Sequence, residues 1–326
     1  MKKNSMHKLI LTISIVLFAI CNGFGSFAQK TNTIAFYNVE NLFDTLDTPD
    51  KNDSEYLPQA AKKWNSRRYM KKLEHINEVL ELTQKPIIAG FCEIENKSVV
   101  EDIINHGPLK GTHVVVHFES MDQRGIDNAI IYDRMLLTLK DKGIIRFTMP
   151  NNGRPTRDII WAKLSTGTDE IMVMVNHWPS RYGGQIESEP KRLVAATAAK
   201  SFIDSVQNAD PRLKIVFMGD LNDYPDNIST MMVSSILEPM ITEKSGKFKG
   251  THNYRGNWHI LDHIMVSQSF LKKKGIHVKK NSGKIYSPEF ILTTYKGNTV
   301  PYRTYGGKKY LGGYSDHLPV SIQIEW

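Results

Sequence analysis

The sequence has few cysteines and lacks a hydrophobic run of membrane-spanning length. Only Cys21 and Cys92 occur among 326 residues. Cys21 lies in an N-terminal segment that we expect to be removed, so the remaining chain cannot form an internal disulfide or a thiolate metal cluster. Cys92, in the apolar segment IIAGFCEI, is expected to be a small buried hydrophobic residue.

The N-terminus has the pattern of an export signal. Three lysines precede the apolar run LILTISIVLFAI, and the small-residue stretch GSFA follows it. This pattern predicts a signal peptide over residues 1–28, export to the periplasm or the cell exterior, and no transmembrane segment after its removal. A lipoprotein anchor on Cys21 is the alternative, but Ile20 stands where a small residue is expected.

The sequence also lacks an acidic excess, internal repeats and low-complexity tracts. Its formal net charge is +8, which favours anionic partners such as nucleic acid or lipid head groups. Apolar and charged content are those of a globular protein, so residues 29–326 are expected to form one domain.

Apolar segments that end in polar residues recur along the chain. They are TNTIAFYNVEN, KPIIAGFCEIEN, EIMVMVNHWPSR, KIVFMGDLND, WHILDHIMVS and YSDHLPVSIQIEW. Residues 114–116, 129–132 and 159–164 are further strand candidates, and apolar spacing predicts helices over 60–82 and 190–206. We therefore predict an α/β fold: a four-layer sandwich of two packed, mostly antiparallel β-sheets flanked by helices.

The polar residues at the strand ends could together form a site for metal binding and proton transfer, which none of them could form alone. Taken singly, Asn38 could cap a turn, His177 could be an exposed loop residue and Asp262 could belong to a local turn, but their joint recurrence at strand ends favours a shared site. The candidates are Asn38, Glu93, His177, Asp220, Asn222, Asp262, Asp316 and His317. Carboxylate and amide oxygens suit a hard ion such as Mg²⁺, and the histidines remain available for proton transfer to or from a phosphate ester. Gly219 is expected to let the backbone turn sharply before Asp220.

These segments resemble the endonuclease/exonuclease/phosphatase superfamily, which has the deoxyribonuclease I-like fold. The resemblance rests on FYNVEN, FCEIEN, RDIIWAKL, VNHW, MGDLND, LDHI and YSDHLPV, which span nearly the whole chain after the signal. It implies a two-sheet sandwich with a divalent-metal phosphoesterase site at one edge.

The resemblance implies a role for each candidate. Glu93 is the expected metal ligand, with Asn38 beside it and Asp316 sharing the ion, which is expected to be Mg²⁺, with Mn²⁺ or Ca²⁺ able to substitute or assist. His317 is the expected general base and Asp262 the carboxylate that holds its ring.

The same resemblance assigns the groups that contact the substrate. Asp220 and Asn222 are expected to position the phosphate and the attacking water, and His177 to donate to a phosphate oxygen. Arg157 matches an arginine that grips phosphate. Arg181, in WPSRYGG, is as compatible with a phosphate contact as with solvent.

The expected function is an exported, Mg²⁺-dependent phosphoric ester hydrolase, specifically a nuclease acting on DNA or RNA, with no stable protein partner. His177 in VNHW resembles the deoxyribonuclease and sphingomyelinase branches. Basic and aromatic residues in NYRGNW and TYGGKKYLGGY fit a nucleic-acid backbone and bases, although plain exposed loops have the same composition. The alternatives are a sphingomyelinase-like or small-molecule phosphodiesterase or phosphatase, and a catalytically inactive binding module.

Overall fold

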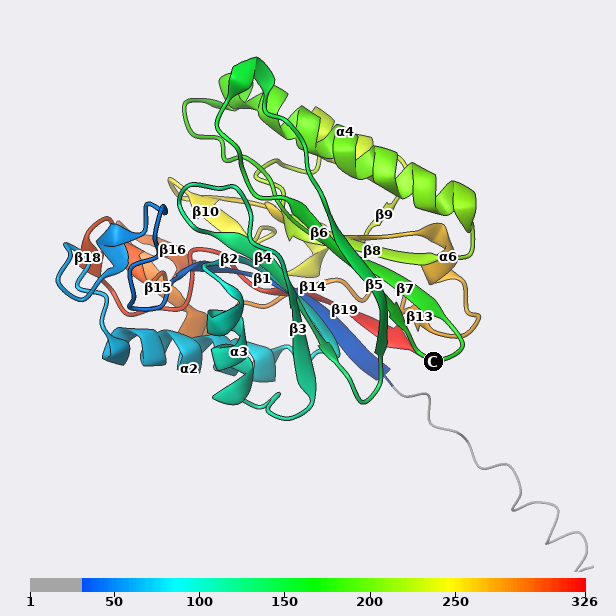
Figure 1. The fold of residues 1–326 in the computed structure, drawn as a ribbon, viewed down its shortest axis with the longest axis horizontal. Coiled ribbons are helices and arrows are strands. Elements are labelled where there is room, and N and C mark those ends of the chain that lie inside the picture. The colour runs from blue at the N-terminus through cyan, green and yellow to red at the C-terminus, as the bar shows by residue number, and fades with distance from the viewer. Residues whose placement is uncertain (1–30) are drawn as a thin grey trace, which may run out of the picture. The chain divides into compact units, whose positions relative to one another are not determined.

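Two β-sheets stacked face to face form the centre of the computed structural model, which describes residues 31–326 (Figure 1). The first sheet has the order β13-β19-β1-β2-β4-β3, with β14 also paired to β19. Its strands are β1 (Thr31–Leu42), β2 (Ile88–Ile94), β3 (His113–His117), β4 (Asp127–Asp133), β13 (His277–Val278), β14 (Lys284–Ile285) and β19 (Val320–Glu325).

The second sheet has the order β5-β6-β7-β8-β12-β9. Its strands are β5 (Thr138–Ile145), β6 (Ile159–Ser165), β7 (Glu170–His177), β8 (Lys214–Asp220), β9 (Glu238–Pro239) and β12 (Asp262–Val266). Only β1–β2 and β7–β8 pair in parallel, whereas the other pairs within the two sheets are antiparallel. The predicted mostly antiparallel two-sheet sandwich is therefore confirmed.

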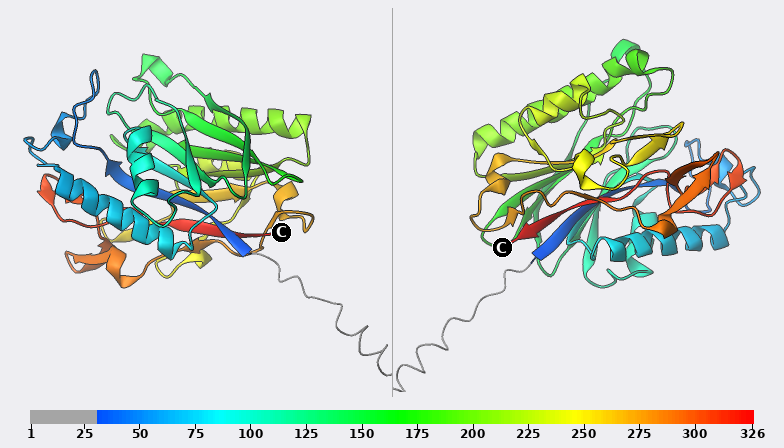
Figure 2. Two further views of the ribbon diagram at one scale, coloured as in Figure 1. Left: turned by 60° about the horizontal axis from the view of Figure 1, so that its bottom comes forward. Right: turned by 180° about the vertical axis from the view of Figure 1, so that it is seen from behind.

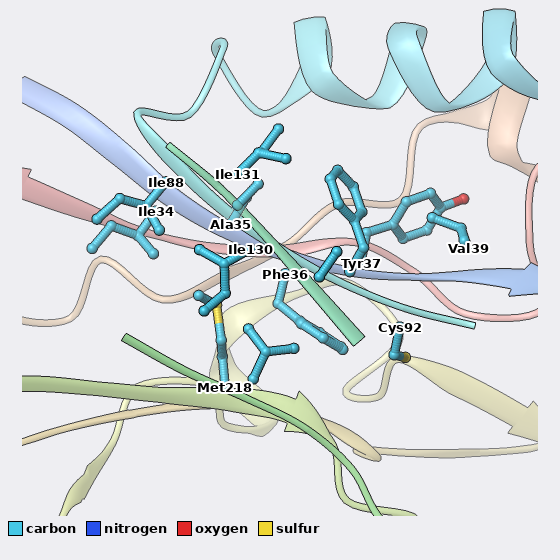
Figure 3. Packing of buried hydrophobic residues seen from close by; sticks show 14 of the residues in the cluster. Ile34, Ala35, Phe36, Tyr37, Val39, Ile88, Cys92, Ile130, Ile131 and Met218 are labelled. Atoms are coloured by element: carbon cyan, nitrogen blue, oxygen red, sulfur yellow. The ribbon is translucent and has the colours of Figure 1, made fainter. Parts of the chain in front are cut away.

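The space between the sheets is filled by aliphatic and aromatic side chains. Phe36 of β1, Ile130 of β4 and Met218 of β8 meet there, and Tyr37 lies on the opposite side of β1, towards α2 (Figure 3). A Cβ on Gly90 would lie 2.7 Å from a methyl group of Val175, so the facing sheets pack closely at this point.

Helices cover the outer face of each sheet and complete the four layers (Figures 1 and 2). The first sheet carries α2 (Ser66–Leu82) and α3 (Lys97–Asn105), and the second carries α4 (Gln185–Ala209) and α5 (Ile228–Ser234). The fully buried Ala195, Ala199 and Ile203 of α4 belong to the same apolar cluster as Met174 and Phe217 of the second sheet. Small residues on this helix face allow a close approach to the sheet.

Both predicted helices exist with shifted starts. α2 begins at Ser66 instead of residue 60, because the side chain of Asn65 accepts the backbone N–H of Arg68 and caps the helix there. α4 begins at Gln185, five residues before Pro190.

Several helices and strands were not predicted from the sequence. They are β5, α3, α5, the short α6 (Gln268–Leu271) and three hairpins: β10 (His252–Tyr254) with β11 (Asn257–His259), β15 (Leu292–Tyr295) with β16 (Asn298–Pro301), and β17 (Tyr305–Gly306) with β18 (Lys309–Tyr310). Short 3₁₀ turns occupy Ser54–Tyr56, Pro150–Asn152, Glu243–Ser245 and Glu289–Ile291. The segment WHILDHIMVS is divided between β11 and β12.

The predicted signal peptide, residues 1–28, and Cys21 within it lie outside the described residues. Thr31–Trp326 make up one compact unit. Within that unit, no helix combines the length and the apolar character needed to cross a membrane. Cys92 is fully buried, as predicted.

Candidate functional site

Strand pairing brings the polar strand ends of the second sheet together. β7 and β8 are parallel, and His177 is the register partner of Asp220 at their final residues. The antiparallel strand β12 begins at the same edge, where Asp262 is the partner of Asp220. Three side chains that are far apart in the sequence therefore share one edge.

The first sheet contributes Asn38 and Glu93 through irregularities in two neighbouring strands. Glu93 has a φ of 61° and lies at a register shift between Cys92 and Ile94, so it is the extra residue of a bulge. The register of β1 shifts after Asn38, and the backbone N–H of Asn41 donates to Glu93 Oε2 at 3.0 Å. These bulges turn the carboxylate of Glu93 towards the edge of the sheet.

Asn38 connects the two sheets. Its Nδ2 atom donates to Asp220 Oδ2 at 3.0 Å and lies 3.4 Å from Glu93 Oε1. Its Oδ1 atom accepts the backbone N–H of Glu40 at 2.9 Å. Asn38 therefore faces both carboxylates as a donor in this arrangement, and its predicted role as a metal ligand stays a prediction.

His317 and Asp262 form a buried pair. His317 Nδ1 donates to Asp262 Oδ2 at 2.7 Å, and His317 Nε2 lies 3.7 Å from Asp220 Oδ2. Burial alone lowers the pKa of His317, but the carboxylates of Asp262 and Asp220 outweigh it and raise the pKa well above its ordinary value. Ser315 fixes the backbone here, since its hydroxyl donates to the carbonyl of Asn38 and accepts the N–H of His317.

Asp220 is the centre of the cluster. Its pKa is raised to about 7, chiefly by burial; the positive charge of His317 acts against this rise and the carboxylate of Asp262 adds to it. Its Oδ1 atom accepts the backbone N–H of Asn222 at 2.9 Å, and Asn222 has a positive φ of 51°. The Asn222 side chain donates to the carbonyl of Trp178 at 3.0 Å.

His177 faces the same carboxylates from the other side. Its Nε2 atom lies 3.8 Å from both Glu93 Oε1 and Asp220 Oδ2. Burial, followed by the charges of Arg157 and Arg124, lowers its pKa well below the ordinary value, so the ring is neutral at pH 7. Its Nδ1 atom is buried and has no hydrogen-bond partner among residues 31–326.

Asp316 lies beside His317 but is bound elsewhere. Arg303 Nη2 donates to Asp316 Oδ2 at 2.9 Å, and Arg303 Nε donates to Glu40 Oε1 at 3.2 Å. Burial raises the pKa of Asp316, but the charges of His317, Arg303 and His252 together lower it by more. The pKa therefore lies below its ordinary value. Its predicted share in metal binding stays a prediction, since Asp316 Oδ2 accepts a hydrogen bond from Arg303.

The donor set fits a hard divalent cation. Within residues 31–326, three groups of His, Asp and Glu bring ligand atoms within 4.8 Å of one another: Asp220–Asp262–His317, His252–Asp316–His317 and His117–Glu119–Asp127. The first two share His317. Glu93 is in none of the three groups, but Asn38 Nδ2 links it to Asp220 of the first, and its side chain is 17% exposed and therefore reachable. Asp262 Oδ1 is buried with no hydrogen-bond partner in this part of the chain, and carboxylate oxygens are the ligands that Mg²⁺ prefers.

The two arginines predicted to bind phosphate are both anchored. Arg157 is buried and donates from its terminal nitrogens to Asp122 at 3.0 Å and to the carbonyl of Trp178 at 2.9 Å. Arg181 stacks over the ring of Tyr224 at 3.8 Å and lies 3.4 Å from the side-chain oxygen of Asn227. Their roles as phosphate ligands stay predictions, because the contacts present are to the protein itself.

The expected role of Gly219 is wrong. Gly219 lies within β8, and it is not among the residues with positive φ. A Cβ at this position would lie 2.2 Å from the carbonyl oxygen of Asn176 on β7. Glycine is needed because the two parallel backbones approach closely, and the turn itself is made at Asn222.

Several neighbours of the site were missed in the sequence. Glu40 and Arg303 contact across 263 positions of the chain, and the rings of His252 and His317 lie 4.9 Å apart. Burial and then the charge of His317 lower the pKa of His252 to about 4. Glu40 lies in the motif FYNVEN, so this motif could have identified it as a site residue. Arg303 lies in a loop that contains no such motif.

Comparison with known proteins supports the resemblance. A sequence model described as "Endonuclease/Exonuclease/phosphatase family" matches residues 33–326. No curated protein matches the sequence significantly.

Solved structures share the fold at low identity. A mannosyl-6-phosphatase of Bacteroides thetaiotaomicron is 16% identical, with a TM-score of 0.59, over 90% of this chain and 100% of that one. The human Nocturnin catalytic domain with bound sulfate is 15% identical, with a TM-score of 0.57, over 91% and 97%. A truncated Caenorhabditis elegans TDP2 is 13% identical, with a TM-score of 0.56, over 91% and 98%.

Proposed function

The chain belongs to the endonuclease/exonuclease/phosphatase family, and from that premise we propose that it is an exported, divalent-metal-dependent phosphodiesterase that cleaves nucleic acid. The observation that carries the proposal is the contact of the two sheets at one edge. There Asn38 and Glu93 of the first sheet meet Asp220 of the second, with the His317–Asp262 pair beside them. Hydrolysis of a phosphate ester needs this combination of hard oxygen ligands and imidazoles.

Glu93 would hold the metal, with Asn38 and Asp316 beside it. The metal would act as a Lewis acid that polarises a phosphoryl oxygen. Asp262 holds the ring of His317 through Nδ1, which leaves Nε2 to take a proton from the attacking water.

The raised pKa of His317 sets a condition on this step. An imidazolium cannot accept a proton, so His317 acts as a base only after it has lost its own. Additional positive charge close to the ring favours the neutral form. A cation bound at this site would therefore favour release of the His317 proton.

The remaining residues bind and orient the phosphate. Asp220 and Asn222 would position the phosphate and the water. The backbone N–H of Asn222 donates to Asp220 Oδ1 and so holds the carboxylate in one orientation. Neutral His177 can donate one N–H to a non-bridging oxygen as negative charge develops there, and one such donor is typically worth ~3 kcal/mol in the transition state.

Nucleic acid is the proposed substrate because of the charge and the loops around the site. The net charge is +8 for the whole sequence and +5 without residues 1–28, which contain Lys2, Lys3 and Lys8 and no acidic residue. Arg303, which binds Asp316, directly precedes the Gly-rich basic segment TYGGKKYLGGY. The neighbour from Bacteroides thetaiotaomicron is described as a mannosyl-6-phosphatase, so a sugar phosphate is the second substrate to test. A sphingomyelinase-like activity is the third.

A substrate panel tests the proposal. The purified chain without residues 1–28 is incubated with plasmid DNA, RNA, a choline phospholipid and mannose 6-phosphate, each with Mg²⁺ and with EDTA. Cleavage of DNA or RNA that EDTA abolishes, and that His317→Ala loses, supports the proposal. Turnover of only the lipid or the sugar phosphate replaces the nuclease with that activity, and no turnover of any ester leaves a binding module.

Export is a separate part of the proposal. Mass spectrometry of the secreted or periplasmic chain is expected to give an N-terminus at Gln29. A lipid-modified Cys21 would instead establish an anchored lipoprotein, and an intact Met1 would contradict export.

A further inference from the structure

We propose that two basic segments, 60–72 and 302–313, form a basic wing that binds the phosphate backbone of a nucleic-acid strand leading to the active site; this rests on the proposed nuclease function. Four exposed cations of the basic wing are proposed to contact the phosphates: Lys63, Arg67, Lys308 and Lys309. The first segment contains six basic residues and the second three, and neither contains an acidic one.

The two segments pack together although more than 230 positions separate them. The guanidinium of Arg68 lies 4.2 Å above the ring centre of Tyr310. The hydroxyl of Tyr305 donates to the carbonyl of Lys62 at 3.0 Å, and the buried Lys72 donates to Thr304 Oγ1 at 2.6 Å. These contacts join the two segments into one surface, so they are not a pair of independent loops.

The positive charge of the wing is largely uncompensated. Lys62 pairs with Glu55 and Lys71 with Glu74. In contrast, none of the ion pairs found between residues 31 and 326 involves Lys63, Arg67, Lys308 or Lys309. Like charges gathered without acids repel one another, so a polyanion that lies across them is bound favourably.

The wing is continuous with the catalytic cluster through Arg303. This residue lies two positions before Tyr305 of β17, its side chain is 46% exposed, and it contacts both Asp316 and Glu40. A strand whose scissile phosphate lies at His317 thus has a path past Arg303 towards Lys308 and Lys309.

The chemistry of the surface favours nucleic acid over a membrane. The tip of the β17–β18 hairpin is Gly306–Gly307–Lys308, which has no apolar side chain to enter a bilayer. Repeated phosphates can engage several separated cations at once, whereas a single sugar phosphate reaches few of them.

The test compares two variants that each lose four positive charges. The wing variant carries Lys63→Gln, Arg67→Gln, Lys308→Gln and Lys309→Gln. The control carries Lys272→Gln, Lys273→Gln, Lys274→Gln and Lys280→Gln, in exposed positions around β13. The control lies at the far end of the sandwich, because His277 is the register partner of Glu325, whereas the active-site end of β19 is at Val320.

Binding of a fluorescent single-stranded oligonucleotide is measured by anisotropy in EDTA, so no turnover is needed. We expect the wing variant to bind about tenfold more weakly near 0.1 M salt, with a salt slope lower by about 2 to 3, because each lost phosphate contact lowers the slope by about 1 or slightly less. The control variant is expected to stay within about twofold of the wild type. Equal affinity of the wing variant and the wild type, or equal losses in both variants, would overturn the proposal.

Two further readouts separate the possible failures. Hydrolysis of the small ester bis(p-nitrophenyl) phosphate is expected to be unchanged in the wing variant, which shows that the catalytic site is intact. If the wild type hydrolyses no ester, the proposed function is contradicted. The binding comparison still shows whether the wing binds nucleic acid. If the wing variant loses binding to phosphatidylserine vesicles but binds the oligonucleotide like the wild type, the nucleic-acid assignment is wrong.

Discussion

His317 Nδ1 lies 2.7 Å from Asp262 Oδ2, and both side chains are buried at the edge where the two sheets meet. The carboxylate stabilises the imidazolium, so the histidine holds its proton more tightly than a free histidine does. The pair therefore fixes both the orientation and the protonation state of the proposed base.

Replacing the carboxylate of this pair tests that relationship. In Asp262→Asn the charge that raises the pKa of His317 is lost, so the pKa is expected to fall, and kcat to fall by about 10² to 10⁴. NMR titration of the His317 ring in the metal-free protein and the pH profile of kcat measure the two effects. Asp141→Asn, on the exposed strand β5, is the control, and an unchanged His317 titration in Asp262→Asn would contradict the assignment.

The carboxylate of Glu93 is expected to dominate cation affinity. Glu93→Gln removes one negative charge at the bulge of β2 and is expected to weaken Mg²⁺ binding about tenfold or more, which is ~1.4 kcal/mol or more. Calorimetric titration with Mg²⁺ measures this. The exposed Glu101→Gln on α3 should bind Mg²⁺ like the wild type, and equal affinities of all three proteins would remove Glu93 from the metal site.

Asp220→Ala and His317→Ala are each expected to abolish most turnover and leave the fold intact. Each removes a group at the meeting point of the sheets, and loss of general acid–base catalysis alone typically costs about 10² to 10⁴ in rate. Initial rates on the best substrate and circular dichroism of the same samples are the measurements. Near-normal activity in either purified variant refutes its role.

Gly219→Ala is expected to destabilise the protein by about 1 to 3 kcal/mol, since overpacking a buried site costs about that much. The added Cβ would lie 2.2 Å from the Asn176 carbonyl, and backbone on both sides resists movement. Urea denaturation measures the free energy of unfolding. Gly306→Ala is the matched control, because its Cβ would meet only the flexible Leu311 side chain at 3.3 Å, and equal stability of the two variants would contradict the close-approach explanation.

The sequence predicted the layers and the residues of the edge because both depend on local patterns. An apolar strand that ends in a polar residue can be recognised within a single segment. Examples are Val175 to His177 and Met218 to Asp220. β5 was missed because its sequence TLKDKGII is half polar, as expected of an edge strand with an exposed face.

Long-range partners could not be read from such patterns. Asp122 and Arg157 lie 35 positions apart, and only the folded chain shows that the arginine is already paired. The role of Gly219 was misread for the same reason, because its missing Cβ matters only against the neighbouring strand β7.

Anomalous diffraction from crystals soaked with Mn²⁺ tests most directly whether one cation is bound where the two sheets meet. We expect a strong peak at about 2.0 to 2.6 Å from a carboxylate oxygen of Glu93, the distance range of oxygen ligands to hard divalent ions, and we expect Glu93→Gln to lose this peak. A peak only at His117–Glu119–Asp127, or no peak at saturating Mn²⁺, would contradict it.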